Sequence, residues 1–529
     1  MRRQQRDLAE GFLFTDLYEL TMAQLYFRAG LHDRPAQFDF LFRSYPDYGS
    51  HKAGYCINAG LGSLLDWMDQ TRIQPAEREW LAGLTGRSGE RIFAPDFLDW
   101  LAEAGHFGGL ELLAVPEGRV VHPGAPLVVA RGPLVQAQLL ETALLNHLCH
   151  QILIATKAAR IRQAGAGQPL MEFGMRRAHG TGATTATRAA LIGGADFSSN
   201  AGASAALGQT AKGTHAHSMV QAFMATGAGE LAAFRAYAEV YPDDCILLVD
   251  TIDTLDSGIP NAIRVFEELR RAGHQPVGIR LDSGDLAELA VRAAEMLDAA
   301  GFAETKIVLS NQLDELTLQQ ILCQIAAEAG DRGRDADAII GRLLYGAGTR
   351  LLTSAGDASL DGVYKLVALQ QGGEWLPAVK VSDSPAKTLD PGNKRLWRLY
   401  DRRDKAVGDL VGLAEEDPDR LDPLELRHPA GARAERSVAR ERLGQIEPLL
   451  EPALRDGRPV GQSLDLAAVR RRRDADLQRL DPGVRRIINP HIYALSLTER
   501  LWSLKQELMR QARSPQRGND QPSKRSIRT

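Results

Sequence analysis

From about residue 168 the chain alternates short apolar runs with helical patterns, in units of about thirty residues, the size of one β-α step. The apolar runs predict strands at 169–173, 195–197, 213–216, 245–249, 277–281, 306–309 and 338–345. The intervening patterns predict helices at 180–191, 202–208, 217–225, 259–272, 286–299 and 312–327. This alternation indicates a parallel sheet with helical crossovers, and the number of units favours a β/α barrel over an open sheet.

The chain before this region has a mixed pattern, which we interpret as an α+β domain over residues 1–165. Helical patterns occur at 13–30, 55–69, 75–84 and 134–164. Strand patterns occur at 37–42, 110–115 and 126–130, and the first of these alternates strictly between apolar and polar residues.

The pattern changes again after residue 362, so the predicted barrel domain covers 166–362. Strands are expected at 363–367 and 395–400 and a helix at 497–512, within a C-terminal region (363–512) that packs back on the N-terminal domain. Residues 513–529 are polar and basic, which is typical of a disordered tail. The run 470–473 consists of four arginines, and such a run is more often a solvated helix face than a phosphate site.

Composition narrows the class of protein. Hydrophobic residues make up 44% and charged residues 25% of 529 residues, as in an ordinary globular protein. A net charge of -4 gives no general bias towards nucleic acid or anionic membranes. The four cysteines are far apart, which argues against a zinc ribbon or a disulfide framework, and no apolar run is long enough to span a bilayer. We therefore expect a soluble cytoplasmic protein.

Polar residues gather at the expected carboxyl ends of the barrel strands, where functional side chains collect in this architecture. They are Arg176, Arg177, Ser198, Ser199, Asn200, His215, His217, Asp250, Asp253, Arg280, Asp282, Asp285, Ser310, Asn311, Gly346, Gly348 and Thr349. Arginine forks bind phosphate or carboxylate, aspartates can hold Mg²⁺ together with substrate phosphates, and a glycine-rich loop lets backbone N–H groups approach a phosphate. The set suits a polyanionic substrate held with a metal.

His215 and His217 leave three interpretations open. On a strand both side chains would face the same way, which suits metal ligation. At a strand end they can diverge, and one can act as a nucleophile or an acid/base. Either can also be a hydrogen-bonded structural histidine. Asp285, at the end of an Asp-Ser-Gly-Asp sequence, could equally be a helix N-cap, and Tyr18 and Phe173 could be ordinary core residues.

Several of these motifs, in this order, resemble nicotinate phosphoribosyltransferase over most of the chain. The matching segments are 14–22 (Phe-Thr-Asp-Leu-Tyr-Glu-Leu-Thr-Met), 172–178 (Glu-Phe-Gly-Met-Arg-Arg-Ala), 213–218 (Gly-Thr-His-Ala-His-Ser), 280–285 (Arg-Leu-Asp-Ser-Gly-Asp), 345–349 (Tyr-Gly-Ala-Gly-Thr), 380–382 with Lys387, 391–394 and 489–491. One such motif would be a weak signal, but the ordered series is specific.

The resemblance implies an irregular β/α barrel of the type II phosphoribosyltransferase kind, with an N-terminal α+β domain and a C-terminal extension. It implies that nicotinate reacts with 5-phosphoribosyl 1-diphosphate to give nicotinate mononucleotide and diphosphate, in NAD biosynthesis. It further implies Mg²⁺ as cofactor, ATP hydrolysis coupled through a phosphohistidine, and a homodimer with shared active sites.

The resemblance also implies residue roles. The family pattern Gly-Thr-x-Ala-His-Ser places the phosphohistidine at His217, whereas His215 falls on a variable position. Asp250 and Asp282 would orient the ribose, the metal or the phosphohistidine region. The residues expected to bind substrate are Tyr18 and Phe173 (stacking on the pyridine ring, Tyr18 across a dimer interface), Arg280 (nicotinate carboxylate or phosphates), Asn311, and Arg176, Gly346, Gly348 and Thr349 (5′-phosphate).

Ser198 bears on the choice between acid and amide. Related nicotinamide enzymes carry an aspartate here, which would repel a carboxylate, so the serine favours nicotinate, although Asp196 lies only two residues earlier. The alternatives are a nicotinamide phosphoribosyltransferase, a metal-dependent barrel hydrolase with His215 and His217 as ligands, and a regulatory or scaffolding barrel.

Overall fold

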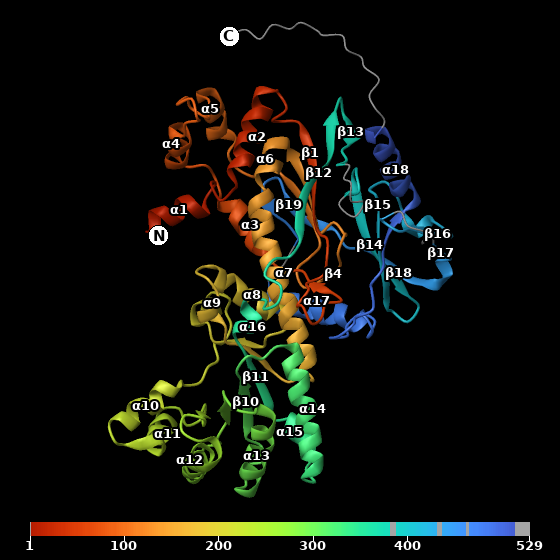
Figure 1. The fold of residues 1–529 in the computed structure, drawn as a ribbon. Coiled ribbons are helices and arrows are strands. Elements are labelled where there is room, and N and C mark those ends of the chain that lie inside the picture. The colour runs from red at the N-terminus through yellow and green to blue at the C-terminus, as the bar shows by residue number, and fades with distance from the viewer. Residues whose placement is uncertain (1, 381–387, 431–435, 462–464, 514–529) are drawn as a thin grey trace.

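The computed structural model describes residues 2–380, 388–430, 436–461 and 465–513 (Figure 1). Predictions for Val381, Ser382 and Lys387, and for the tail after Arg513, lie outside the described residues. Three larger sheets and one short two-stranded sheet organise the chain. Among the described residues, no helix combines the length and the apolar composition that crossing a membrane requires.

One antiparallel sheet combines strands from the two ends of the chain. Its seven strands are β1 (Pro35–Phe42), β3 (Glu111–Ala114), β5 (Val128–Pro133), β12 (Gly362–Gln371), β13 (Glu374–Pro377), β19 (Glu451–Arg455) and β20 (Arg458–Pro459). Their order is β13-β12-β1-β5-β3-β19-β20, so β1 lies near the centre. The alternation of apolar and polar residues in β1 would predict one solvent-exposed face. Neither face is exposed, because the polar residues Gln37 and Asp39 are buried too. Asp39 forms a buried ion pair with Lys394, 3.0 Å apart.

Seven helices accompany this sheet in the N-terminal part. They are α1 (Arg3–Glu10), α2 (Leu17–Arg28), α3 (Leu61–Gln70), α4 (Pro75–Gly83), α5 (Pro95–Ala104), α6 (Leu134–Leu139) and α7 (Glu141–Ala164). The single helix predicted at 55–69 is wrong in its first turn: β2 (Cys56–Ile57) pairs with β4 (Val120–Val121) before α3 begins. The chain turns at Gly60, whose φ of 102° favours glycine.

A six-stranded parallel sheet forms the centre of the second region. Its strands are β6 (Leu170–Glu172), β7 (Phe197–Ser198), β8 (Ile246–Leu248), β9 (Gly278–Leu281), β10 (Lys306–Ser310) and β11 (Leu343–Ala347). The order is β7-β6-β11-β10-β9-β8, and within the described chain no ladder joins β7 to β8. The predicted irregular barrel is therefore confirmed in the form of a curled sheet that stays open on one side.

Helices between these strands cover the sheet. They are α8 (Gly182–Gly193), α9 (Ala201–Ala206), α10 (His217–Ala225), α11 (Gly229–Val240), α12 (Ile259–Arg271), α13 (Leu286–Ala299), α14 (Glu315–Asp331), α15 (Ala336–Ile340) and α16 (Thr349–Leu352). Figure 1 shows α7 running down from the first region to this one, so a single helix belongs to both. Helix α11 was not among the helices predicted from the sequence, although its Ala233 and Phe234 are buried.

Two strand predictions in this region are wrong. Residues 213–216 form a loop, and the nearby backbone joins the sheet only through an isolated bridge between Ser198 and Ala211. The predicted strand at 338–345 begins instead as α15, because the Asp335 side chain caps that helix by accepting from the N–H groups of Asp337 and Ala338. The strand starts only at Leu343.

A third sheet and two helices complete the C-terminal part. The strands are β14 (Lys394–Asp401), β15 (Ala406–Leu413), β16 (Leu424–Arg427), β17 (Arg436–Val438), β18 (Leu443–Pro448) and β21 (Leu495–Thr498), and the helices are α17 (Leu466–Arg479) and α18 (Glu499–Arg513). The strands predicted at 363–367 and 395–400 and the terminal helix are present as β12, β14 and α18.

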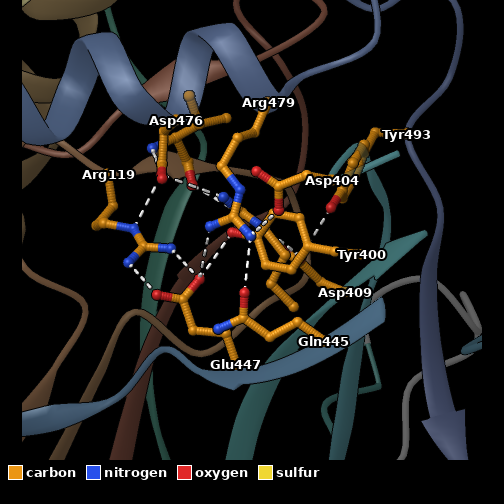
Figure 2. Close-up of polar contacts among 11 residues, drawn as sticks. Arg119, Tyr400, Asp404, Asp409, Gln445, Glu447, Asp476, Arg479 and Tyr493 are labelled. Atoms are coloured by element: carbon orange, nitrogen blue, oxygen red, sulfur yellow. Dashed lines mark hydrogen bonds and ion pairs between the residues drawn. The ribbon is translucent and has the colours of Figure 1, made fainter. Parts of the chain in front are cut away.

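A buried set of ion pairs joins this third sheet to α17 and β4 (Figure 2), and we call Arg119, Arg398, Asp409, Glu447 and Asp476 the C-terminal ion network. Arg119 donates to both carboxylate oxygens of Glu447 at 2.8 Å and to Asp476 at 2.9 Å. Arg398 donates to both oxygens of Asp409 and to Asp476. Each charge has an opposite partner, which keeps this burial tolerable.

The arginine run on α17 is neither a phosphate site nor a simple solvated face. Arg470 donates to the carbonyl oxygens of Leu191 and Ala195, and Arg473 donates to that of Ile192. These acceptors lie at or just after the C-terminal end of α8, where helix carbonyl groups lack partners within the helix. Of the four arginines only Arg471 is exposed, and the other three are partly buried. The run therefore fastens α17 to the barrel.

Candidate active site

Polar residues from the ends of β8, β9 and β10 meet at one edge of the parallel sheet. Asp250 follows β8, Arg280 and Asp282 lie at the end of β9, and Ser310 ends β10. The strands are parallel and adjacent, so their carboxyl ends bring these side chains together. Ser310 donates to Asp282 Oδ1 at 2.6 Å, which fixes that carboxylate.

His217 is the first residue of α10, and its side chain faces this cluster. Its Nδ1 lies 3.1 Å from the hydroxyl of Thr251, and its Nε2 lies 3.8 Å from Asp250 Oδ1 and 3.8 Å from Asp282 Oδ2. The His217 side chain is 37% exposed, whereas that of Asp250 is 2% exposed. The imidazole thus faces two carboxylates on one side and solvent on another.

Asp250 has one oxygen engaged and one oxygen free. Its Oδ2 accepts from the backbone N–H of Asp282 at 3.1 Å and from the hydroxyl of Ser283. Its Oδ1 is buried and has no hydrogen-bond partner within the described residues. This is the oxygen nearest to His217. A buried carboxylate oxygen without a partner is costly, so the arrangement suits a ligand that completes it.

Arg280 organises the floor of the cluster. Its Nε donates to Ser310 at 2.9 Å, and its two terminal nitrogens donate to Thr214 and Asp282, each at 3.1 Å. The contact with Thr214 holds the loop that carries both histidines. A guanidinium has five N–H donors, so two remain for a ligand. Its central carbon also lies 5.3 Å from the centre of the Phe173 ring.

The Phe173 ring packs directly over Gly346. A side-chain Cβ at Gly346 would lie 2.6 Å from two carbons of the ring, which real contacts do not show. The glycine thus makes room for Phe173. A Cβ at Gly348 would lie 3.2 Å from the Phe173 carbonyl oxygen, so the second glycine also serves close packing. Thr349 begins the short helix α16 beside them.

A buried carboxylate that directly precedes Phe173 in the chain was assigned no role from the sequence. Glu172, fully buried, accepts from the hydroxyls of Ser198 at 2.6 Å and Thr187 at 3.0 Å and from the N–H of Gly174. Ser198 is itself buried and turned towards this acid. The signal was present, because Glu172 stands directly before Phe173 in an otherwise apolar strand.

His215 is a structural histidine. Its Nε2 accepts from the backbone N–H of Leu248 at 3.1 Å, and its ring meets Tyr237 edge-on at 4.9 Å. Burial lowers the pKa of His215 to about 4, so the ring is neutral near pH 7. The two histidines diverge, and no group of three or more potential metal ligands (His, Cys, Asp or Glu) occurs in the described part of the chain. This arrangement disfavours a hydrolase in which both histidines bind zinc.

Other residues singled out from the sequence lie apart from this cluster. Tyr18 is 47% exposed on α2, in the N-terminal part of the molecule (Figure 1), and no contact with Phe173 is recorded among the described residues. Arg176 is exposed in the short helix Met175–Arg177 after β6. Asn311 is exposed with a φ of 103° directly after β10.

The curled parallel sheet and the polar residues at its strand ends define an α/β-barrel protein of the type II phosphoribosyltransferase class. Family models for the nicotinate phosphoribosyltransferase N-terminal and C-terminal domains match residues 13–149 and 393–505. The chain belongs to the nicotinate phosphoribosyltransferase family.

The similarity extends over nearly the whole chain. A nicotinate phosphoribosyltransferase of Bacillus subtilis is 35% identical over 504 residues, covering 95% of this chain and 96% of the relative. A nicotinate phosphoribosyltransferase of Homo sapiens is 34% identical over 544 residues, covering 93% and 95%. The crystal structure of human nicotinic acid phosphoribosyltransferase superposes with a TM-score of 0.74 at 31% identity, covering 93% of this chain and 99% of that one.

Proposed function

We propose that this chain is an ATP-dependent nicotinate phosphoribosyltransferase. It would join nicotinate to the ribosyl group of 5-phosphoribosyl 1-diphosphate, releasing diphosphate and forming nicotinate mononucleotide for NAD biosynthesis. Family membership supports the substrates. The observation that carries the mechanism is the position of His217, whose Nε2 faces Asp250 and Asp282 at the open end of the sheet.

The geometry of His217 suits a phosphohistidine. If Nδ1–H donates to Thr251, the lone pair of Nε2 is left free to attack. That lone pair would form an N–P bond to the γ-phosphorus of ATP while the P–O bond to the departing ADP breaks. Water would later cleave the N–P bond, which couples ATP hydrolysis to the phosphoribosyl transfer. The 37% exposure of the His217 side chain leaves room for the nucleotide to approach.

Asp250 and Asp282 fit a magnesium ion. Two carboxylates near a phosphoryl group would repel it unless a cation lay between them. Mg²⁺ commonly binds through one or two carboxylates together with substrate phosphates, and the unpartnered Oδ1 of Asp250 is a ready ligand. The ion would neutralise charge on the departing diphosphate. In this chain the carboxylates are held in place by Ser283 and Ser310.

Nicotinate would lie beside Phe173, with its carboxylate directed to the two free N–H donors of Arg280. Ser198 is expected to favour the acid because it brings no negative charge to this position, and its hydroxyl donates to the buried Glu172. The remaining predicted substrate contacts would hold the 5′-phosphate and the ribose; they are Arg176, Asn311, Gly346, Gly348 and Thr349.

The second stacking residue, Tyr18, would come from a second copy of the chain. Tyr18 is 47% exposed, and its neighbours Leu17 and Leu25 on α2 are 46% and 62% exposed. An apolar helix face of this kind suits burial in a homodimer. Each active site would then contain residues of both copies.

The test is formation of nicotinate mononucleotide from nicotinate, 5-phosphoribosyl 1-diphosphate and Mg²⁺, with and without ATP, in wild type and His217→Ala. We expect product in both, with ATP stimulation only in wild type. Nicotinamide serves as the competing substrate. Turnover of nicotinamide in place of nicotinate would contradict the substrate, and stimulation that persists in His217→Ala would contradict the phosphohistidine.

A further inference from the structure

A second cavity lies away from the His217 cluster, between α3, α7 and the start of α8. Its volume is about 760 Å³, within the range of small-molecule sites. Its walls include Phe14, Trp67, His147, Gln151 and Gly182. His147 and Gln151 belong to α7. Figure 1 shows this helix passing between the two larger regions. None of the residues contacting Asp250 or Asp282 lines this cavity.

The base of the cavity carries polar atoms without partners. Gln151 is 1% exposed, yet neither its side-chain oxygen nor its side-chain nitrogen has a hydrogen-bond partner among the described residues. The Nε2 of His147 is also buried and unpartnered. A buried amide whose donor and acceptor groups lack partners is energetically costly. A ligand in the cavity that bonds to these atoms would remove this cost.

Aromatic rings form one wall beside these polar atoms. The His147 ring lies 6.2 Å from that of Phe14 and 6.1 Å from that of Trp67, and Phe14 and Trp67 are 6.3 Å apart. Such a wall favours a flat ring. The Gln151 amide presents a donor and an acceptor side by side, which matches the same pair on a carboxamide.

The charges around the cavity favour a neutral ligand. Burial lowers the pKa of His147 to about 4, so this histidine is uncharged near pH 7. The rim carries the exposed acids Glu10 and Asp66, and none of the described lining residues is lysine or arginine. A carboxylate entering the cavity would meet like charge and no cation, whereas a carboxamide would meet neither penalty.

We propose that this cavity is a second binding site, for a neutral aromatic carboxamide whose amide pairs with Gln151. It lies outside the His217 cluster, and the proposal does not depend on the proposed reaction. The ring would lie against Phe14 and Trp67, and the volume leaves room for an attached sugar.

The proposal can be tested by ligand-detected NMR with nicotinamide as the probe, on the full chain with saturating nicotinate present. We expect nicotinamide to bind and not to be displaced. Gln151→Leu should weaken binding at least tenfold, since it removes both polar atoms. Gly182→Leu should do the same by filling the cavity, and the new side chain starts in open space, because a Cβ there meets nothing within 4 Å.

Gln320→Leu is the matched control, because Gln320 is exposed on α14, outside the cavity. It should bind nicotinamide as wild type does. Three results would overturn the proposal: displacement of nicotinamide by nicotinate, absence of nicotinamide binding, or unchanged affinity in both Gln151→Leu and Gly182→Leu. Failure of the proposed reaction would leave these outcomes unaffected.

Discussion

Two of the places where acidic and basic side chains meet in this molecule are built differently. In the C-terminal ion network (Figure 2), Asp476 is 2.9 Å from Arg119 and 3.2 Å from Arg398, within hydrogen-bonding distance and away from solvent. In the candidate active site, His217 stands 3.8 Å from two carboxylates and is partly exposed.

The difference lies in how completely the charged groups are paired, and it distinguishes a stabilising cluster from a ligand-binding one. Paired groups within hydrogen-bonding distance, with opposite charges in balance, leave little capacity for a ligand and hold strands and helices together. The carboxylates near His217 are also held in place, but Oδ1 of Asp250 lacks a partner. The network therefore has a structural role, and the site is preorganised for a bound group.

The largest effect is expected from Asp476→Ala. This change leaves Arg119 and Arg398 buried with one acceptor fewer and also removes the acceptor for the N–H of Val120. We expect a loss of about 3–5 kcal/mol in unfolding free energy, measured by urea denaturation. Asp474→Ala, at an exposed position on the same helix, is the control. Equal stability of the two variants would contradict a structural role for the network.

Asp250→Asn should reduce activity and leave stability unchanged, whereas Asp476→Ala should reduce stability. The amide keeps the size of the side chain but removes its charge beside His217, so we expect activity to fall by about a hundredfold or more while the urea midpoint stays near that of wild type. Asp253→Asn is the matched control, because Asp253 only caps the following turn through two backbone N–H groups. Retained activity in Asp250→Asn would remove Asp250 from the mechanism.

The acid stability of the network gives a third comparison. Hydrogen bonding and charge from Arg119 outweigh the effect of burial and lower the pKa of Glu447 to about 2. A carboxylate with a lowered pKa contributes stability that is present above its ordinary value near 4.5 and is lost as the pH falls towards 2. Glu447→Gln should therefore show a flatter decline in thermal midpoint between pH 4.5 and 2 than wild type. Parallel curves would contradict this assignment.

The smallest effect concerns the arginines of α17. Arg470→Ala removes donors to the carbonyl groups after α8 and should cost about 1–2 kcal/mol in unfolding free energy. Arg471→Ala, next to it and exposed, should change stability by no more than about 0.5 kcal/mol. Both can be compared by urea denaturation. A loss from Arg470→Ala as small as that from Arg471→Ala would favour the solvated-face interpretation.

The alternation of strands and helices was readable because the barrel strands are buried on both faces and form continuous apolar runs. The strand predicted at 213–216 is wrong, because these residues form a loop that leads into the helix beginning at His217. Ala338–Ile340 were misread because a short apolar run fits either a strand or a helix, and the cap at Asp335 decides between them.

The roles within the site depended on tertiary contacts. The spacing alone left His215 and His217 equivalent, and only the family resemblance favoured His217. The bond from the backbone N–H of Leu248 then shows that His215 has a structural role. Ser198 stood at the expected strand end, but its orientation towards Glu172 could not be foreseen without the fold. The arginine run on α17 likewise needed the end of α8, nearly 280 residues earlier in the chain, to acquire a role.

The most direct test of the account is the site of phosphorylation. The protein would be incubated with ATP labelled with ³²P at the γ-phosphate, and the label mapped to a peptide. We predict an acid-labile label on His217 in wild type and in His215→Asn, and no label in His217→Asn. Labelling that persists in His217→Asn, or that maps to any other residue, would contradict the central role of His217.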